Sequence, residues 1–157
     1  MKDKDFLIDS WETIKKWQKN VDNWGKCDAL SKIYTKVLEI IPGRVLEQLK
    51  QWNKSKKIWD KRQSLVSLLY FSRTKNILLP YETIISFVSE LIDDNEYYVQ
   101  KGVGWTLKEL YKVYPNKTLK YIEENIARIS AIAFSVTIGN LEKADKEKLK
   151  KMRKYSR

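Results

Sequence analysis

The chain has 157 residues, the length of one domain with a hydrophobic core of its own. Hydrophobic residues make up 43% of it and charged residues 32%, which excludes a disordered chain and indicates a globular protein. Lys and Arg outnumber Asp and Glu by 31 to 20, and the resulting net charge of +11 favours anionic partners such as nucleic acid or anionic lipid.

Cysteine and histidine content limits the chemistry further. Cys27 is the one cysteine and the chain has no histidine, so an internal disulfide is excluded and a structural zinc site is disfavoured. We expect no metal and no cofactor. The N-terminus lacks the apolar core of a signal peptide, and no stretch reaches the apolar length of a membrane span. We therefore expect a cytoplasmic protein without a membrane partner.

Helices are expected along the whole chain, because apolar residues recur every three or four positions and Gly and Pro are scarce. The first predicted helix covers residues 5–20. The second runs from about Trp24 to Ile41 and stops at Pro42, since proline cannot continue a helix. A short third helix at 44–53 and a fourth at 56–75 follow. The apolar side of the first helix consists of Leu7, Trp11, Ile14 and Trp17.

The second half of the chain continues in the same way. Pro80 precedes a fifth predicted helix at 81–93, and a sixth at 96–114 is closed by Pro115. Pro115 also suits the first turn of a seventh helix at 116–130. Gly139 marks a break, and the charged segment 142–157 is expected to be a helix or tail in solvent.

The longer helices also repeat one another. IWDKRQSLVSLLY at 58–70 aligns with YVQKGVGWTL at 98–107, so that Trp59 falls on Tyr98 and Arg62 on Lys101, and Trp24 falls on Trp59. The offsets of 39 and 35 residues predict stacked helix pairs of the HEAT kind. We therefore expect an all-α fold of HEAT-like repeats, a single domain over residues 1–157. Antiparallel helix pairs would stack into a curved, right-handed α-α superhelix.

Three segments, NWGKCDALS, IWDKRQSLVSLL and DDNEYYVQKGVGWTLKE, follow one another over about residues 20–140. Together they resemble the alkylpurine DNA glycosylases of the AlkD type, HEAT-like proteins of DNA alkylation repair. The first is similar to the family's segment that joins a tryptophan, here Trp24, to the catalytic aspartate, here Asp28. The second is similar to its Trp-x-x-Arg helix and places Arg62 on the family's arginine. The third matches through Tyr98, Lys101, Gly104-Trp105 and Leu107-Lys108-Glu109.

The resemblance implies an enzyme that hydrolyses the N-glycosidic bond of N3- or N7-alkylated purines in duplex DNA. Such a base is a cationic, good leaving group, so the enzyme has to stabilise an oxocarbenium-like sugar and place a water beside it. Asp28 would supply the carboxylate, one helical turn from Trp24. Trp24 and Trp105 would pack against the deoxyribose. Arg62 would bind a flanking phosphate, with Lys101 and Lys61 as further DNA contacts.

Taken without the resemblance, the same residues also have structural interpretations. Asp28 suits a helix start, where the macrodipole favours a negative charge. Trp105 lies in an apolar stripe and suits the core, although the preceding Gly104 favours a close-packed or surface-lining position. Arg62 suits a solvated helix face, and Cys27 a small apolar filler. The remaining tryptophans, Trp11, Trp17, Trp52 and Trp59, are expected to pack in the core or between repeats.

Two departures from the family pattern keep other functions open. Family members have helical repeats ahead of the first motif, and here about twenty residues precede Trp24, so we expect part of the DNA cradle to be missing. Gly25, followed by Lys26 and Cys27, stands where those enzymes have bulkier or acidic residues. The alternatives to a glycosylase are a HEAT-like module that binds nucleic acid without chemistry and a scaffold for protein interactions.

Overall fold

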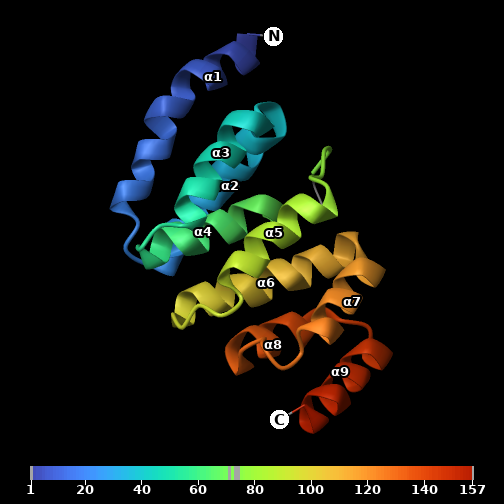
Figure 1. The fold of residues 1–157 in the computed structure, drawn as a ribbon. Helices are drawn as coiled ribbons and strands as arrows, with labels where there is room; N and C mark the ends of the chain where they lie inside the picture. The colour runs from blue at the N-terminus through green and yellow to red at the C-terminus, as the bar shows by residue number, and fades with distance from the viewer. Residues whose placement is uncertain (1, 71, 73–74, 157) are drawn as a thin grey trace. The chain divides into compact units, whose positions relative to one another are not determined.

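The computed structural model describes residues 2–70, 72 and 75–156. Its described residues form nine α-helices and no strand (Figure 1). This confirms the all-α fold that the helical periodicity predicts. The helices pack into two compact units, Met1–Leu78 and Leu79–Arg157. Each helix in the described part of the chain is too short or too polar to cross a lipid bilayer.

Helices separated by short connections build the first unit. Its central helix, α4, is buried over eight consecutive residues from Arg62 to Leu69, and it packs on α2 and α3. Pro42 is the first residue of α3. A backbone N–H at this position has no acceptor within the helix, so the missing N–H of proline costs no hydrogen bond. The elements are α1 (Lys2–Ile14), the 3₁₀ segment η1 (Lys15–Asn20), α2 (Trp24–Ile40), α3 (Pro42–Asn53) and α4 (Ile58–Leu69).

The predicted first helix is wrong over its second half. The α-helix ends at Ile14, whose carbonyl accepts a hydrogen bond from the Tyr34 hydroxyl, and the chain continues as η1. A 3₁₀ helix has three residues per turn in place of about 3.6, which changes the residues that face the core. In η1 the buried residue is Gln18. Trp17 is therefore 43% exposed and is not a core residue, whereas Trp11 and Ile14 are buried as predicted.

The fourth helix is also shorter than predicted. It begins at Ile58 and ends at Leu69, with Tyr70 leaving the helical conformation at its C-terminus. The prediction that it continues to residue 75 falls partly on residues 71, 73 and 74, which lie outside the described part of the chain. Trp52 is buried on α3 and Trp59 is half-buried on α4.

The second unit contains a helix that the sequence pattern does not separate. The predicted seventh helix ends at Glu124, followed by turns, and a further helix starts at Ala131, where the Ser130 side chain accepts the N–H of Ala133. Gly139 lies in a 3₁₀ turn, as a break there predicts. The elements are α5 (Tyr81–Leu91), α6 (Tyr97–Val113), α7 (Pro115–Glu124), α8 (Ala131–Thr137), η3 (Ile138–Asn140) and α9 (Lys143–Tyr155).

The charged helix α9 is anchored and does not extend freely into solvent. Leu149 is fully buried, and the guanidinium of Arg153 donates to the carbonyls of Ile126 and Ile129. The Tyr111 hydroxyl donates to Asp145 near the start of the helix. The helix expected in this segment is therefore present and mostly exposed, and Asp145, Leu149 and Arg153 hold it against the preceding elements.

Hydrogen bonds between side chains mark the repeat directly. In the first unit Arg62 and Asp28 are 34 residues apart, and Gln63 and Ser31 are 32 apart. In the second unit Arg128 contacts Asp93 at a separation of 35 residues. These separations are close to the predicted period, so the helical repeat is confirmed. The single domain, the HEAT type and the curved superhelix stay predictions.

Gly104 fixes the closest approach of α6 and α8. A Cβ at this position would lie 2.5 Å from the carbonyl oxygen of Ala133 and 2.8 Å from the Cβ of Val136. The Thr137 hydroxyl also lies 3.4 Å from the Gly104 carbonyl oxygen. Gly104 is therefore close-packed, which is one of the two roles that its place before Trp105 predicts.

We expect Gly104→Ala to lower the free energy of unfolding by about 1–3 kcal/mol, because the added methyl meets backbone atoms that cannot rotate away. Urea unfolding followed by circular dichroism measures the change. Gly139→Ala is the matched control, since a Cβ there has nothing within 4 Å. Equal midpoints for the two variants would contradict the packing role of Gly104.

Candidate active site

The start of α2 sets the position of its functional side chains. Asn23 is the N-cap, and its side-chain oxygen accepts the N–H of Lys26 at 3.0 Å. Asp22 pairs with Lys26 at 2.8 Å across the same turn. A Cβ at Gly25 would lie only 3.2 Å from the capping oxygen, so a glycine there suits the tight cap. The helix therefore begins at Trp24. This starting point determines which side chains of α2 face solvent.

Trp24 and Asp28 lie on one exposed face of α2. Trp24 is 58% exposed, although it is a large apolar side chain. Asp28 stands one turn further on, with its side chain 28% exposed, while Cys27 beside it is completely buried. Since Asn23 caps this helix, Asp28 is not needed at the helix start. The arrangement offers an aromatic ring and a carboxylate to the same region of solvent.

Arg62 of α4 holds the Asp28 carboxylate. Its Nη2 lies 3.1 Å from the Asp28 Oδ1, and the arginine side chain is only 9% exposed. Among the described residues Arg62 is the one hydrogen-bond partner of the Asp28 side chain, and this side chain stays partly exposed. The cation thus fixes one carboxylate oxygen from inside the protein.

Polar contacts beyond the pair, on its C-terminal side in both helices, keep α2 and α4 in register. The Gln63 side-chain amide donates to the hydroxyls of Ser31 and Ser67, at 2.6 and 2.8 Å. One turn further along α2, the Thr35 hydroxyl donates to the carbonyl of Tyr70 at 3.2 Å. These bonds are buried or partly buried, so a shift of one helix along the other would leave several polar groups unsatisfied. The ion pair therefore has a rigid frame.

Two neighbours of the pair have altered acidities. Burial raises the pKa of the Cys27 thiol to about 12, against a smaller opposing effect of Arg62, so the thiol stays protonated at neutral pH. It is an inert apolar filler, as expected. Burial also raises the pKa of Tyr70, and the negative charge of Asp28 adds to this effect.

Tyr70 is a site neighbour that the motifs do not indicate. Its electrostatic coupling to Asp28 and Arg62 places it close to the pair. It stands just beyond the C-terminal end of α4, where the chain has left the helical conformation. Helical periodicity therefore carries no signal that would have found it.

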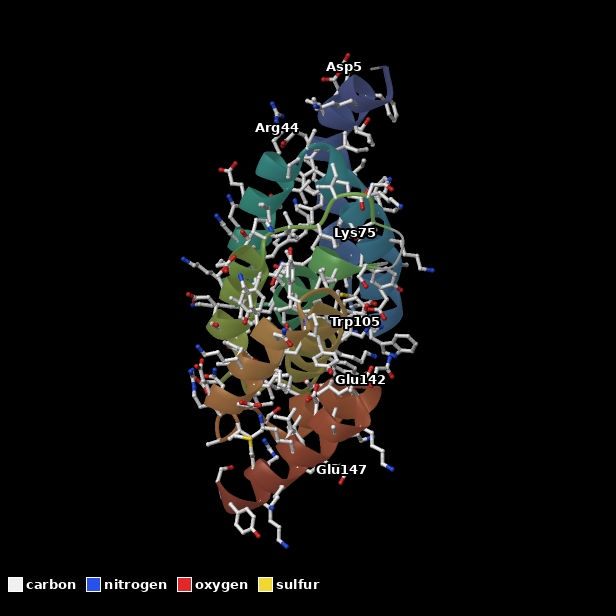
Figure 2. The ribbon with its side chains drawn as sticks, turned by 90° about the vertical axis from the view of Figure 1, so that its right-hand side faces the viewer. Asp5, Arg44, Lys75, Trp105, Glu142 and Glu147 are labelled. Carbon is white, nitrogen blue, oxygen red and sulfur yellow. The ribbon has the colours of Figure 1, made fainter. Side chains whose placement is uncertain are left out.

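The other predicted site residues have different surroundings. Lys61, next to Arg62 on α4, is half-buried. Trp105 and Lys101 lie on α6 in the second unit, where Trp105 is half-buried and not part of the core (Figure 2). The Lys101 ammonium lies 5.6 Å from the centroid of the Tyr97 ring, a cation–π contact. Tyr97, Lys101 and Trp105 follow one another at four-residue spacing and so share one stripe of α6.

Among the described residues, no group of three or more Cys, Asp or Glu side chains is placed to hold a metal ion. The chemistry available to the first unit is thus an outward carboxylate, an exposed indole and a buried guanidinium. A carboxylate held in this way attracts a cation or a group that is becoming cationic, and it also accepts a proton from a water.

Comparison with known proteins identifies the family of the chain. The family model described as DNA alkylation repair enzyme matches residues 1–141, which include the site and end before α9. No curated protein and no solved structure gives a match to the chain. The matched region covers well over half of the chain. The chain therefore belongs to the DNA alkylation repair enzyme family.

Proposed function

We propose that the protein is a DNA glycosylase that hydrolyses the N-glycosidic bond of purines alkylated at N3 or N7. The observation that carries the proposal is the fixed carboxylate of Asp28, outward-facing beside the exposed ring of Trp24. Membership of the DNA alkylation repair family gives the class of damage. The net charge of +11 supports a polyanionic substrate.

The reaction needs little acid catalysis, because the alkylated base already carries a positive charge and leaves readily. As the bond to the base breaks, positive charge develops on the deoxyribose. A carboxylate about 4 Å from that charge contributes roughly 4 kcal/mol of attraction where the effective dielectric constant is about 20. Asp28 would supply this attraction through Oδ2 and would orient the attacking water.

Trp24 would act on the same charge by a different interaction. The face of an indole ring attracts cations with about 0.5–2 kcal/mol, depending on exposure. Trp24 precedes Asp28 by one turn, so both side chains reach the same side of α2. Trp105 is proposed from the family resemblance alone to pack against the sugar, with Lys101 and Lys61 as DNA contacts.

Arg62 has a second possible role besides the phosphate contact that the resemblance implies. It is 8% exposed and its guanidinium bonds Asp28, which supports a positioning role toward the carboxylate. The two roles have different kinetic consequences. A positioning residue affects the rate at saturating enzyme, whereas a phosphate contact affects mainly DNA affinity and its salt dependence.

We expect Asp28→Asn to lower the rate of base release by at least about a hundredfold, close to 3 kcal/mol, because the amide keeps the shape but not the charge. The measurement is single-turnover release of N7-methylguanine from a duplex oligonucleotide. Asp22→Asn is the matched control, an exposed carboxylate just before the same helix, and should retain the wild-type rate. Release by Asp28→Asn at the wild-type rate would refute the catalytic assignment. A folded wild-type protein that binds DNA without releasing base would favour the binding module instead.

We expect Arg62→Gln to reduce the saturated single-turnover rate about ten- to a hundredfold while duplex affinity changes less than about threefold. Arg62→Lys should have a rate between those of Arg62→Gln and wild type, because lysine keeps the positive charge but lacks the planar guanidinium group. Arg44→Gln, which removes an exposed arginine of the same unit, controls for the loss of one charge. A fall in affinity and salt dependence with an unchanged saturated rate would instead assign Arg62 to a phosphate.

A further inference from the structure

The first unit contains a strongly basic cleft that the catalytic proposal does not use. It has a volume of about 250 Å³ and lies between η1, α3 and the start of α4, with the buried Trp52 among its lining residues. We call it the basic cleft and define it by its charged residues and Gln18. These are Lys15, Lys16, Gln18, Lys19, Lys57 and Asp60.

Positive charge in the basic cleft is not balanced by the protein. Lys15 is paired with Glu12 at 2.7 Å. The side chains of Lys16, Lys19 and Lys57 are exposed, and none has a carboxylate partner among the described residues. Asp60 is the one acid of the cleft, and its carboxylate accepts hydrogen bonds from Gln18 and Ser55. Three exposed ammonium groups without an ion pair in the described part of the chain, and a fourth paired with Glu12, therefore line a cleft with one carboxylate.

A buried side chain holds the two lysine-bearing segments together. Gln18 is 4% exposed, and its Nε2 donates to the Trp59 carbonyl and to the Asp60 carboxylate, both at 3.2 Å. Gln18 lies between Lys16 and Lys19, while Trp59 and Asp60 follow Lys57 at the start of α4. The contact thus maintains lysines from distant parts of the chain around one space, against their mutual repulsion.

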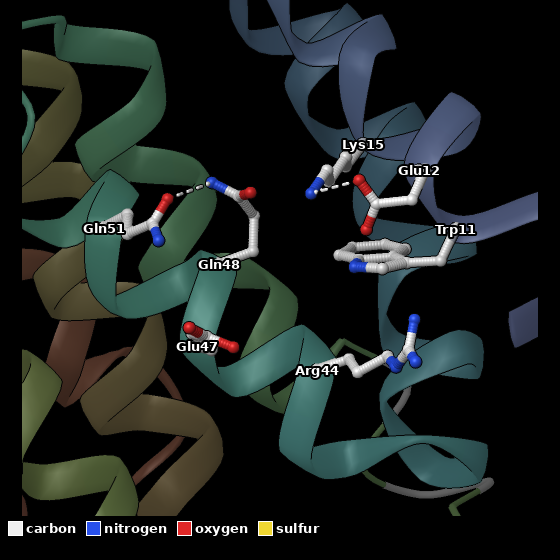
Figure 3. Close-up of a pocket in the computed structure, with 7 residues that line it drawn as sticks. All are labelled: Trp11, Glu12, Lys15, Arg44, Glu47, Gln48 and Gln51. Carbon is white, nitrogen blue, oxygen red and sulfur yellow. Dashed lines mark hydrogen bonds and ion pairs between the residues drawn. The ribbon is translucent and has the colours of Figure 1, made fainter.

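The neighbouring cleft shows that this charge excess is local. That cleft shares Lys15 and Gln48 with the basic cleft but is lined on its other sides by Glu12, Arg44 and Glu47 (Figure 3). Its two cations face two carboxylates, and Glu12 pairs with Lys15. An anion gains little attraction there. Of these two clefts, the one formed by η1 and the start of α4 therefore carries the excess positive charge.

We propose that the basic cleft binds phosphate groups of a nucleic-acid backbone and serves as an anchor beside the Asp28 site. α4 carries Asp60 of the cleft and Arg62 of the site, and η1 leads through three residues to Trp24 at the start of α2. Lysine ammonium groups bind phosphate oxygens as mobile point charges and read no sequence. That the polyanion is DNA rests on the proposed function.

The test neutralises the three unpaired lysines together in Lys16→Gln/Lys19→Gln/Lys57→Gln. Affinity for an undamaged duplex is measured from about 0.05 to 1 M salt. We expect the magnitude of the slope of log affinity against log salt to fall by about 2.7, because each of the three lost phosphate contacts removes about 0.9. Relative to wild type, binding at 0.1 M salt is then about five-hundredfold weaker than it is at 1 M salt.

The matched control is Lys4→Gln/Lys36→Gln/Lys50→Gln, which removes three exposed lysines of the same unit that do not line the cleft. The control should keep a slope near that of wild type, since distant charges are screened beyond about 10 Å at 0.1 M salt. Equal loss in both variants, an unchanged slope in the cleft variant, or a wild-type protein that does not bind the duplex would overturn the proposal.

Two further measurements keep the result interpretable. Thermal unfolding checks that the triple variants are folded. If the cleft variant is unfolded, the single variants Lys16→Gln and Lys19→Gln are measured in its place. Each single variant should change the slope by about 1. Because undamaged DNA is used, the cleft is tested independently of base release. A wild-type protein that binds with the expected slope but releases no base would retain the cleft and refute the glycosylase.

Discussion

The ion pair between Asp28 and Arg62 is the interaction on which the candidate site depends. Arg62 is buried on the central helix of the first unit, and a buried guanidinium is stabilised by a nearby anion because an uncompensated buried charge is costly. Asp28 supplies that anion while remaining partly exposed. The same contact that satisfies a buried cation thereby fixes an outward carboxylate. The polar bonds of Gln63 and Thr35 along the same helices keep this geometry from shifting.

Charged side chains lie both at this ion pair and further from it. Near the pair, a negative carboxylate and an aromatic face would stabilise the cationic sugar of the proposed reaction. Further out, the lysines of η1 and the start of α4 form a positive surface, which we propose to bind phosphates. Gln18 joins the two regions, since it contacts Trp59 and Asp60 on the helix that bears Arg62. Anchor and carboxylate are thus parts of one packed unit.

Much of the fold could be predicted from the sequence, because amphipathic periodicity and three prolines define most helices and their ends. The 3₁₀ turn after Ile14 and the separate helix at Ala131 could not, since they depend on a tertiary hydrogen bond from Tyr34 and on a Ser130 cap within an apolar stretch. For the site, the spacing of Trp24 and Asp28 sufficed to predict a shared helix face. The pairing of Asp28 with Arg62 was not predicted, because 34 residues separate them and only the stacked repeat brings them together.

The central claim is that Asp28 stabilises positive charge on the sugar, and the most direct measurement is binding of a charged sugar analogue. A duplex with a cationic pyrrolidine in place of one deoxyribose is compared with a duplex that carries a neutral tetrahydrofuran there. The account predicts that wild type prefers the cationic analogue by about a hundredfold, near 3 kcal/mol, and that Asp28→Asn loses this preference while binding the neutral duplex unchanged. Equal preference in both proteins would contradict the claim.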